Sequence, residues 1–232
     1  MKTDAPNAGC AASAPPSKRL AARRAAFLSA AREVFQQKGY AEATLDDVIA
    51  RSGGSRQTLY SLFGGKQGLF EALVTETCWS IFGKLTPERL ASQSPDLVLT
   101  EVGVRYLEIV LSPQVLNLTR LVVAEASRIP EIADTYWRLG PGRSRAFLTE
   151  FFERQIERGL LEMADSRKAA DHFLEMLSGT IRFQCLTGVR QPPDGVEIRE
   201  IVASAVTQFL HGCAKAQGAP PAPDKMEPPA SA

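Results

Sequence analysis

Apolar residues recur every three or four positions along most of this chain, and no window alternates between apolar and polar residues over a sustained run. Phe27, Ala30, Ala31, Val34 and Phe35 show the pattern, which places them on one face of a helix. A half-buried β-strand would instead place an apolar residue at every second position. The sequence therefore predicts an all-α fold of about nine helices.

The expected helix boundaries carry the residues that favour helix ends. Ser94–Pro95 and Ser112–Pro113 each place a proline at the first helical position after a serine cap. Ser166 and Asp194 are candidate caps of two later helices, and Gly39 supplies a stop for the first.

Composition divides the chain into four parts. Residues 1–16 are rich in Ala, Pro and Ser, and residues 216–232 contain five prolines and no aromatic residue. Such segments bury too little apolar surface to offset their conformational entropy, so we expect both to be disordered tails. Between them we expect a helix-turn-helix DNA-binding domain at 17–66 and a second helical domain at 67–215.

Two short helices separated by small residues predict the helix-turn-helix. Thr44-Leu45-Asp46-Asp47 opens the first like a capping box, and Ser55 caps the second, which runs from Arg56 to Phe63. The intervening Gly53-Gly54 suits a steep helix crossing.

The outward face of the second short helix is polar. Arg and Gln, here Arg56 and Gln57, are side chains that read guanine and adenine edges in the major groove. Thr58, Tyr60 and Lys66 are types that contact phosphates. A solvated corner without a partner is the alternative reading of the same pattern. The candidate DNA-binding residues are Thr44, Ser55, Arg56, Gln57, Thr58, Tyr60, Ser61 and Lys66.

The distribution of charge along the chain also favours DNA binding by the amino-terminal segment. Residues 1–71 hold ten Lys and Arg against six Asp and Glu, a net charge of +4, whereas residues 72–232 have a net charge of −3. A positive amino-terminal segment on a mildly negative body suits double-stranded DNA as a partner.

The segment 21–74 resembles the DNA-binding domain of TetR-family transcriptional regulators. The matching elements are A-x-x-x-F-x-x-x-G-Y from Ala31, T-L-Y-x-x-F from Thr58 and K-x-x-L-F from Lys66. The resemblance implies that Thr44, Thr58, Tyr60 and Lys66 contact phosphates and that Arg56 and Gln57 meet bases or backbone. Leu62 and Gly54 depart from the usual pattern.

Residues 119–130 are similar to the carboxy-terminal domain of the AefR-like branch of this family. The resemblance implies a homodimer that binds a pseudo-palindromic operator, with a second domain for dimerisation and effector binding. Regulators of this kind are mostly repressors. We therefore expect a repressor released by a small apolar or aromatic effector, with a DNA-binding activator of the same fold left open.

Two helices near the end of the chain are apolar nearly all round, at 167–187 and 196–213. A surface helix needs one apolar stripe, so these helices are expected to be buried on a second side by a partner subunit in a four-helix bundle. The expected interface residues are Phe173, Leu177, Ile181, Val202, Val206 and Phe209.

Candidates for an effector pocket are aromatic and polar residues on these largely apolar helices. Ligand pockets are mostly apolar with a few placed polar groups, although core packing explains any single aromatic residue as well. The candidate ligand-binding residues are Trp79, Phe82, Tyr106, Arg120, Trp137, Phe151, Phe183 and Gln184.

Other functional classes find little support. The chain has no G-x-G-x-x-G, P-loop, G-x-S-x-G or H-E-x-x-H motif, and its two histidines have no patterned partners. A small-molecule-processing helical enzyme remains the alternative class. The four cysteines are widely spaced, so no metal site, cofactor or disulfide framework is expected. With no apolar run that predicts a signal peptide or a membrane span, we expect the cytoplasm.

Overall fold

The structure is a computed structural model that describes residues 18–79 and 93–212, and within those ranges every regular element is a helix. The predicted all-α fold is confirmed. The expected tails at 1–16 and 216–232 lie outside the described residues. The helices are α1 (Lys18–Glu42), α2 (Leu45–Ser52), α3 (Arg56–Phe63), α4 (Lys66–Trp79), α6 (Pro95–Val110), α7 (Pro113–Glu125), α8 (Pro130–Leu139), α9 (Pro141–Glu157), α10 (Ser166–Thr187) and α11 (Gly195–His211).

Side chains cap most of the predicted helix starts. Thr44 forms the full capping box with Asp47, and Ser55 and Ser112 accept hydrogen bonds from the backbone of their helices. One cap differs from expectation, because α10 is capped by Asp165 and begins at Ser166. At Gly39 the backbone leaves the helical region, with φ of 77°, so α1 is kinked where a stop was expected.

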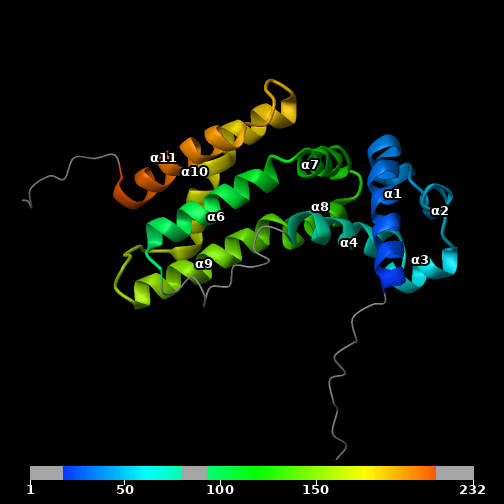
Figure 1. Cartoon of the computed structure of the whole chain (residues 1–232), viewed down its shortest axis with the longest axis horizontal. Coiled ribbons are helices and arrows are strands. Elements are labelled where there is room, and N and C mark those ends of the chain that lie inside the picture. The colour runs from blue at the N-terminus through cyan, green and yellow to red at the C-terminus, as the bar shows by residue number, and fades with distance from the viewer. Residues whose placement is uncertain (1–17, 80–92, 213–232) are drawn as a thin grey trace, which may run out of the picture.

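The molecule is elongated, with α1, α2 and α3 at one end and α6, α9, α10 and α11 at the other (Figure 1). Helices α4, α7 and α8 lie between the two ends and join them (Figure 1). Each end has its own apolar core. The first is built on α1–α4 and also takes in Leu118 and Val122 of α7 and Ile132 and Tyr136 of α8. The second is built on α6, α9, α10 and α11.

Helix α4 is thus shared by the two halves. Leu69, Phe70, Leu73 and Val74 are buried in the amino-terminal core, so the apolar packing of that half continues past Lys66. Cys78, one turn further on, also packs against this core and lines a cavity together with Tyr106 and Arg182 of the carboxy-terminal half.

Gly54, in the turn between α2 and α3, is required by close packing. A Cβ atom at this position would overlap the ring of Phe27, which is fully buried under the turn. The glycine at position 54, which departs from the usual pattern, is therefore required on steric grounds.

No described helix is by itself both long and apolar enough to cross a membrane. Helices α6 and α7 reach that length and composition only when taken together across a 64° bend.

Candidate DNA-binding surface and ligand cavity

Helix α3 presents one polar face to solvent. Leu59 is fully buried and Phe63 nearly so, which fixes the rotation of the helix on the core. Arg56, Gln57 and Ser61 are consequently exposed, and Tyr60 is 49% exposed. The structure therefore brings together on one face the side chains that the sequence predicted to read bases.

Arg56 is paired with Asp46 of α2. Its Nη2 atom lies 2.8 Å from Asp46 Oδ2, and the side chains are 62% and 70% exposed. Exposed ion pairs contribute little free energy, about 0–1 kcal/mol. Arg56 is therefore easily released to a base or phosphate.

Thr44 is exposed, but its hydroxyl is engaged at the start of α2. It accepts a hydrogen bond from Asp47 N at 3.1 Å and donates to Asp47 Oδ2 at 2.8 Å. The hydrogen bond from Lys38, together with those from Thr44, lowers the pKa of Asp47 to about 2. The capping box holds α2 and leaves α3 in a fixed orientation.

Lys66 starts α4 and is partly buried. Its Nζ atom donates to the carbonyl of Ala41 at 3.0 Å and lies 4.6 Å from the centre of the Tyr40 ring. Burial lowers the pKa of Lys66, and the carboxylates of Glu125 and Glu42 oppose that shift. A phosphate contact by Lys66 therefore requires the ammonium group to leave, or to share, its contact with Ala41.

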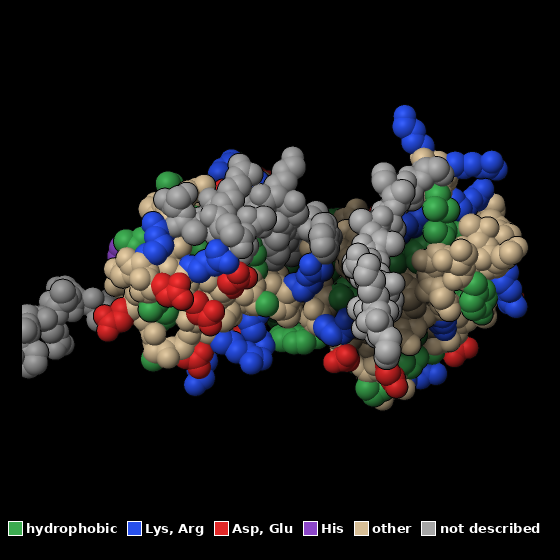
Figure 2. All heavy atoms as spheres, turned by 90° about the horizontal axis from the view of Figure 1, so that it is seen from below, with side chains coloured by type: hydrophobic (Ala, Val, Ile, Leu, Met, Phe, Trp, Pro, Cys, Tyr) green, Lys and Arg blue, Asp and Glu red, His purple; other side chains and the backbone are tan. Residues whose placement is uncertain are grey.

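Two arginines that the sequence analysis did not include lie beside α3. Arg19 and Arg23, from the start of α1, line a hollow with Gly53, Ser55 and Thr58. Arg23 Nη1 donates to the carbonyl of Gly53 at 2.7 Å. Figure 2 shows Lys and Arg side chains along the upper and outer sides of this end of the molecule, with acidic side chains at its lower edge. The four-residue spacing of Arg19 and Arg23 places both on one face of a helix, and this spacing was the sequence signal that could have identified them.

A cavity lies in the carboxy-terminal half, where α4, α6, α8, α9 and α10 meet. Its volume is about 300 Å³, counting space open to solvent. Its wall is mainly apolar. The lining residues are Cys78, Tyr106, Ile109, Val110, Val115, Tyr136, Gly140, Pro141, Ser144 and Arg182.

Of the predicted ligand-binding residues, Tyr106 lines this cavity. Phe151 is fully buried in the second core, and Phe183 is 66% exposed. Trp137 is half exposed, with the guanidinium group of Arg145 stacked over its ring. These three side chains do not line the cavity, because helical periodicity alone does not specify which neighbour a face meets.

The other predicted ligand-binding residues also lie elsewhere. Arg120 donates to the carbonyls of Cys185 and Leu186 and so holds the end of α10. Gln184 is on that last turn and does not line the cavity. Phe82 and the side chain of Trp79 lie outside the described part of the chain.

Of the polar residues that line the cavity, Tyr136 and Ser144 were not predicted, whereas Arg182 was among the polar residues that the sequence places on largely apolar helices. Tyr136, Ser144 and Arg182 come from three different helices and converge on it. Arg182 carried the clearest signal, because it is a cation on an otherwise apolar segment of α10.

The six residues expected at a subunit interface need correction. Phe173, Leu177, Ile181, Val202 and Val206 are each at most 8% exposed and belong to the core of the single chain, with Phe209 packed against it. The second apolar side of α10 and α11 is covered by α6 and α9 of the same chain. The apolar side chains that these two helices leave exposed are Met176, Phe183 and Val196.

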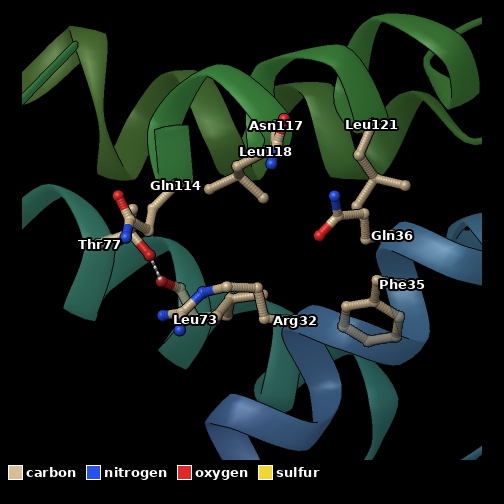
Figure 3. A pocket seen from close by; sticks show the side chains of 9 residues that line it. All are labelled: Arg32, Phe35, Gln36, Leu73, Thr77, Gln114, Asn117, Leu118 and Leu121. Carbon is tan, nitrogen blue, oxygen red and sulfur yellow. Dashed lines mark hydrogen bonds between the residues drawn. The ribbon is translucent and has the colours of Figure 1, made fainter. Parts of the chain in front are cut away.

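A cleft of about 320 Å³, counting space open to solvent, lies between α1, α4 and α7. Figure 3 shows Arg32 and Gln36 of α1 facing Asn117 and Leu118 of α7 across it, with Thr77 of α4 at one side. Phe35, Leu73 and Leu118, which line the cleft, also belong to the amino-terminal core, so the cleft lies at the edge of packed helices.

Comparison with known families matches both halves of the chain. Residues 27–73 match the family described as bacterial regulatory proteins, tetR family. Residues 97–212 match the AefR-like transcriptional repressor, C-terminal domain. No curated protein matches the chain.

Solved structures show the same fold. A TetR-family regulator structure from Mesorhizobium loti is 24% identical, covers 84% of this chain and 98% of its own, and has a TM-score of 0.70. A flavonoid-responsive regulator, FrrA, is 23% identical with the same coverage and a TM-score of 0.68. A TetR-family regulator from Pseudomonas syringae pv. tomato is 22% identical, covers 81% of this chain and 94% of its own, and has a TM-score of 0.62.

Proposed function

The chain belongs to the TetR family of transcriptional regulators, and we propose that it acts as an operator-binding repressor that a small apolar or aromatic effector releases. It works by binding rather than by catalysis. In this proposal 17–66 contacts DNA, and 67–215 binds effector and forms a homodimer, with α4 packed in both.

The observation that carries DNA binding is the exposed polar face of α3. Arg56 and Gln57 are side chains that form bidentate hydrogen bonds with guanine and adenine, and both are exposed near the start of a rigidly capped helix. Thr44, Ser55, Thr58, Tyr60, Ser61 and Lys66 surround them as candidate backbone contacts. The basic residues Arg19 and Arg23 extend the surface.

A homodimer places two such helices about a two-fold axis, which suits a pseudo-palindromic site. We propose that the exposed sides of α10 and α11 pair with those of a second copy. The supporting observation is Phe183, which is 66% exposed and lies two turns from the exposed Met176 on the same face of α10. Large exposed apolar side chains that gather on one face mark interaction surfaces.

The effector site in this proposal is the cavity lined by Tyr106, Tyr136 and Arg182. Helix α4 contributes Cys78 to its wall, and a Cβ at Gly140, at the α8–α9 junction, would lie 3.3 Å from Cys78 Sγ. The junction therefore packs closely against α4. In this proposal a ligand that widens the cavity displaces α4, whose other end lies beside α3.

The test of DNA binding is selection from random duplexes with the full chain. We expect enrichment of a pseudo-palindrome, with an affinity that falls steeply as salt rises, because phosphate contacts release counterions. Val123→Ser is a suitable control, since Val123 is 72% exposed on α7, far along the chain from α3. Selection that enriches no sequence would contradict the proposal.

A further inference from the structure

Several arginines of the carboxy-terminal half pair with carboxylates, whereas Arg120 and Arg182 donate only to neutral groups among the described residues. Arg105 and Arg190 each reach a carboxylate, Glu101 at 2.9 Å and Glu197 at 2.7 Å. Arg182 has only neutral partners among the described residues. Its Nη2 atom donates to Tyr136 Oη at 3.1 Å and to Thr119 Oγ1 at 3.3 Å.

The Nε–H group of Arg182 takes no part in these hydrogen bonds. It is buried and has no hydrogen-bond partner among the described residues, although Arg182 lines the cavity. A buried donor without an acceptor costs free energy, and it costs more when the donor is charged. An acceptor that enters the cavity removes this cost.

The hydroxyl groups around Arg182 are already oriented. Thr119 donates its single proton to the carbonyl of Val115 at 2.8 Å, so the 2.7 Å contact with Tyr136 requires Tyr136 to be the donor. Arg182 donates to both oxygens. The protons of Thr119 and Tyr136 are therefore both engaged within the protein, and the guanidinium group of Arg182 is the positively charged donor at the cavity.

The other titratable groups of the cavity stay neutral. Burial raises the pKa of Tyr106 and that of Tyr136, and it raises the pKa of the Cys78 thiol to about 11. None of these three groups supplies a negative charge to Arg182 near neutral pH. The rest of the wall, with Ile109, Val110 and Pro141, is apolar.

We propose that the effector is an organic anion, a carboxylate on an apolar or aromatic body, and that Arg182 binds its charged group. The planar guanidinium group matches a carboxylate, and the apolar wall takes the rest of the molecule. This inference rests on the proposed function, because it names the ligand class of the same cavity. It adds a charge requirement to a ligand otherwise defined only by its apolar body.

The experiment compares acids with their uncharged amides of nearly the same shape. Octanoate against octanamide, and cinnamate against cinnamamide, are titrated into the full-length protein by calorimetry. We expect each acid to bind about ten- to a hundredfold more tightly than its amide, the range for a hydrogen bond to a charged group. In Arg182→Gln the acid and the amide should bind within about threefold of each other.

Arg105→Gln is the matched control. It removes one positive charge from α6, the helix that carries Tyr106, but Arg105 does not line the cavity. This variant should keep the full preference for the acids. Arg182→Lys keeps the positive charge but lacks the Nε donor, so the preference of this variant for acid over amide should fall without vanishing. If Arg182→Gln does not fold, the Arg182→Lys variant tests whether Arg182 binds the charged group.

Three results would overturn the inference: equal binding of acid and amide by the wild type, a preference that survives in Arg182→Gln, or binding of none of the four probes. Binding to the selected operator duplex is measured in parallel. If the duplex binds and the acids are not preferred, the ligand class is wrong and the DNA-binding function stands. If no duplex is selected while the acids bind through Arg182, the proposed function fails and the anion site stands.

Discussion

Arg56 and Gln57 are two neighbouring side chains with different surroundings. Arg56 forms an exposed ion pair with Asp46, whereas Gln57 is exposed and forms no hydrogen bond or ion pair with another described residue. Neither is needed to pack the core, because Leu59 and Phe63 do that for α3. Replacing them should therefore change DNA recognition without changing the fold.

Arg56→Ala and Gln57→Ala should each relax base preference at one symmetric pair of positions in the selected site. The loss expected for one bidentate contact is about 1–3 kcal/mol. The measurement is repeated selection from random duplexes, with thermal unfolding to check that the variants fold. If both variants return the wild-type sequence preference, these residues do not read bases directly.

Gly54→Ala tests close packing at the turn between α2 and α3. The added methyl group would overlap the ring of Phe27, which cannot move out of the core without strain. We expect the free energy of unfolding to fall by about 1–3 kcal/mol, as for overpacked cores. Gly195→Ala is the control, because a Cβ there meets only the end of the Arg199 side chain at 3.4 Å. Equal stability of the two variants would show that the turn has room.

At the scale of elements, α2 is short, so the hydrogen bonds that cap its first turn are important for its stability. It has eight residues, and its amino terminus is closed by the reciprocal hydrogen bonds of Thr44 and Asp47. Lys38 of α1 adds a contact of 2.6 Å to the same carboxylate. The capping box therefore also ties α2 to α1, and α3 takes its position from both.

Asp47→Asn should destabilise the protein in a pH-dependent way. The pKa of Asp47 is lowered from its ordinary 3.8 to about 2 in the folded chain, so its carboxylate stabilises the fold above about pH 4. This contribution is lost as the pH falls through about 2. Urea unfolding of wild type and variant should therefore differ near neutral pH and converge in acid.

Lys38→Gln provides the control for this experiment, because it removes the cation that lies closest to the Asp47 carboxylate. In the Lys38→Gln background the effect of Asp47→Asn near neutral pH should be smaller. A difference that is the same at every pH would assign the role of Asp47 to hydrogen bonding alone.

At the scale of the whole molecule, α7 contributes to both cores, with Leu116 in one and Leu118 in the other, and a cleft lies between α1, α4 and α7 (Figure 3). Glu125 of α7 reaches across to the kink of α1, where the absence of a side chain at Gly39 makes room for its carboxylate. Helices α4, α7 and α8 line the proposed effector cavity at their other ends. Effector binding and DNA binding would therefore be coupled through rigid helices.

Phe183→Glu and Val206→Asp separate assembly from folding. Phe183 is 66% exposed, so a charge there should dissociate the proposed dimer while the chain stays folded. Val206 is 6% exposed within the core of one chain, so a charge there should unfold it. Light scattering gives the mass and circular dichroism gives the melting temperature. A Phe183→Glu variant that remains dimeric at micromolar concentration would place the interface elsewhere.

The sequence by itself determined the helices and the shape of the DNA-binding face. Periodicity and caps act over three or four residues, so Thr44, Ser55 and the exposed side of α3 follow from local order alone. Only the tertiary structure decided which second face of a helix meets which neighbour. Phe173 and Val206 proved to be core rather than interface, and Tyr136 and Arg182, 46 residues apart, meet at the cavity. Such contacts depend on how whole helices pack, and helical periodicity does not encode the partner.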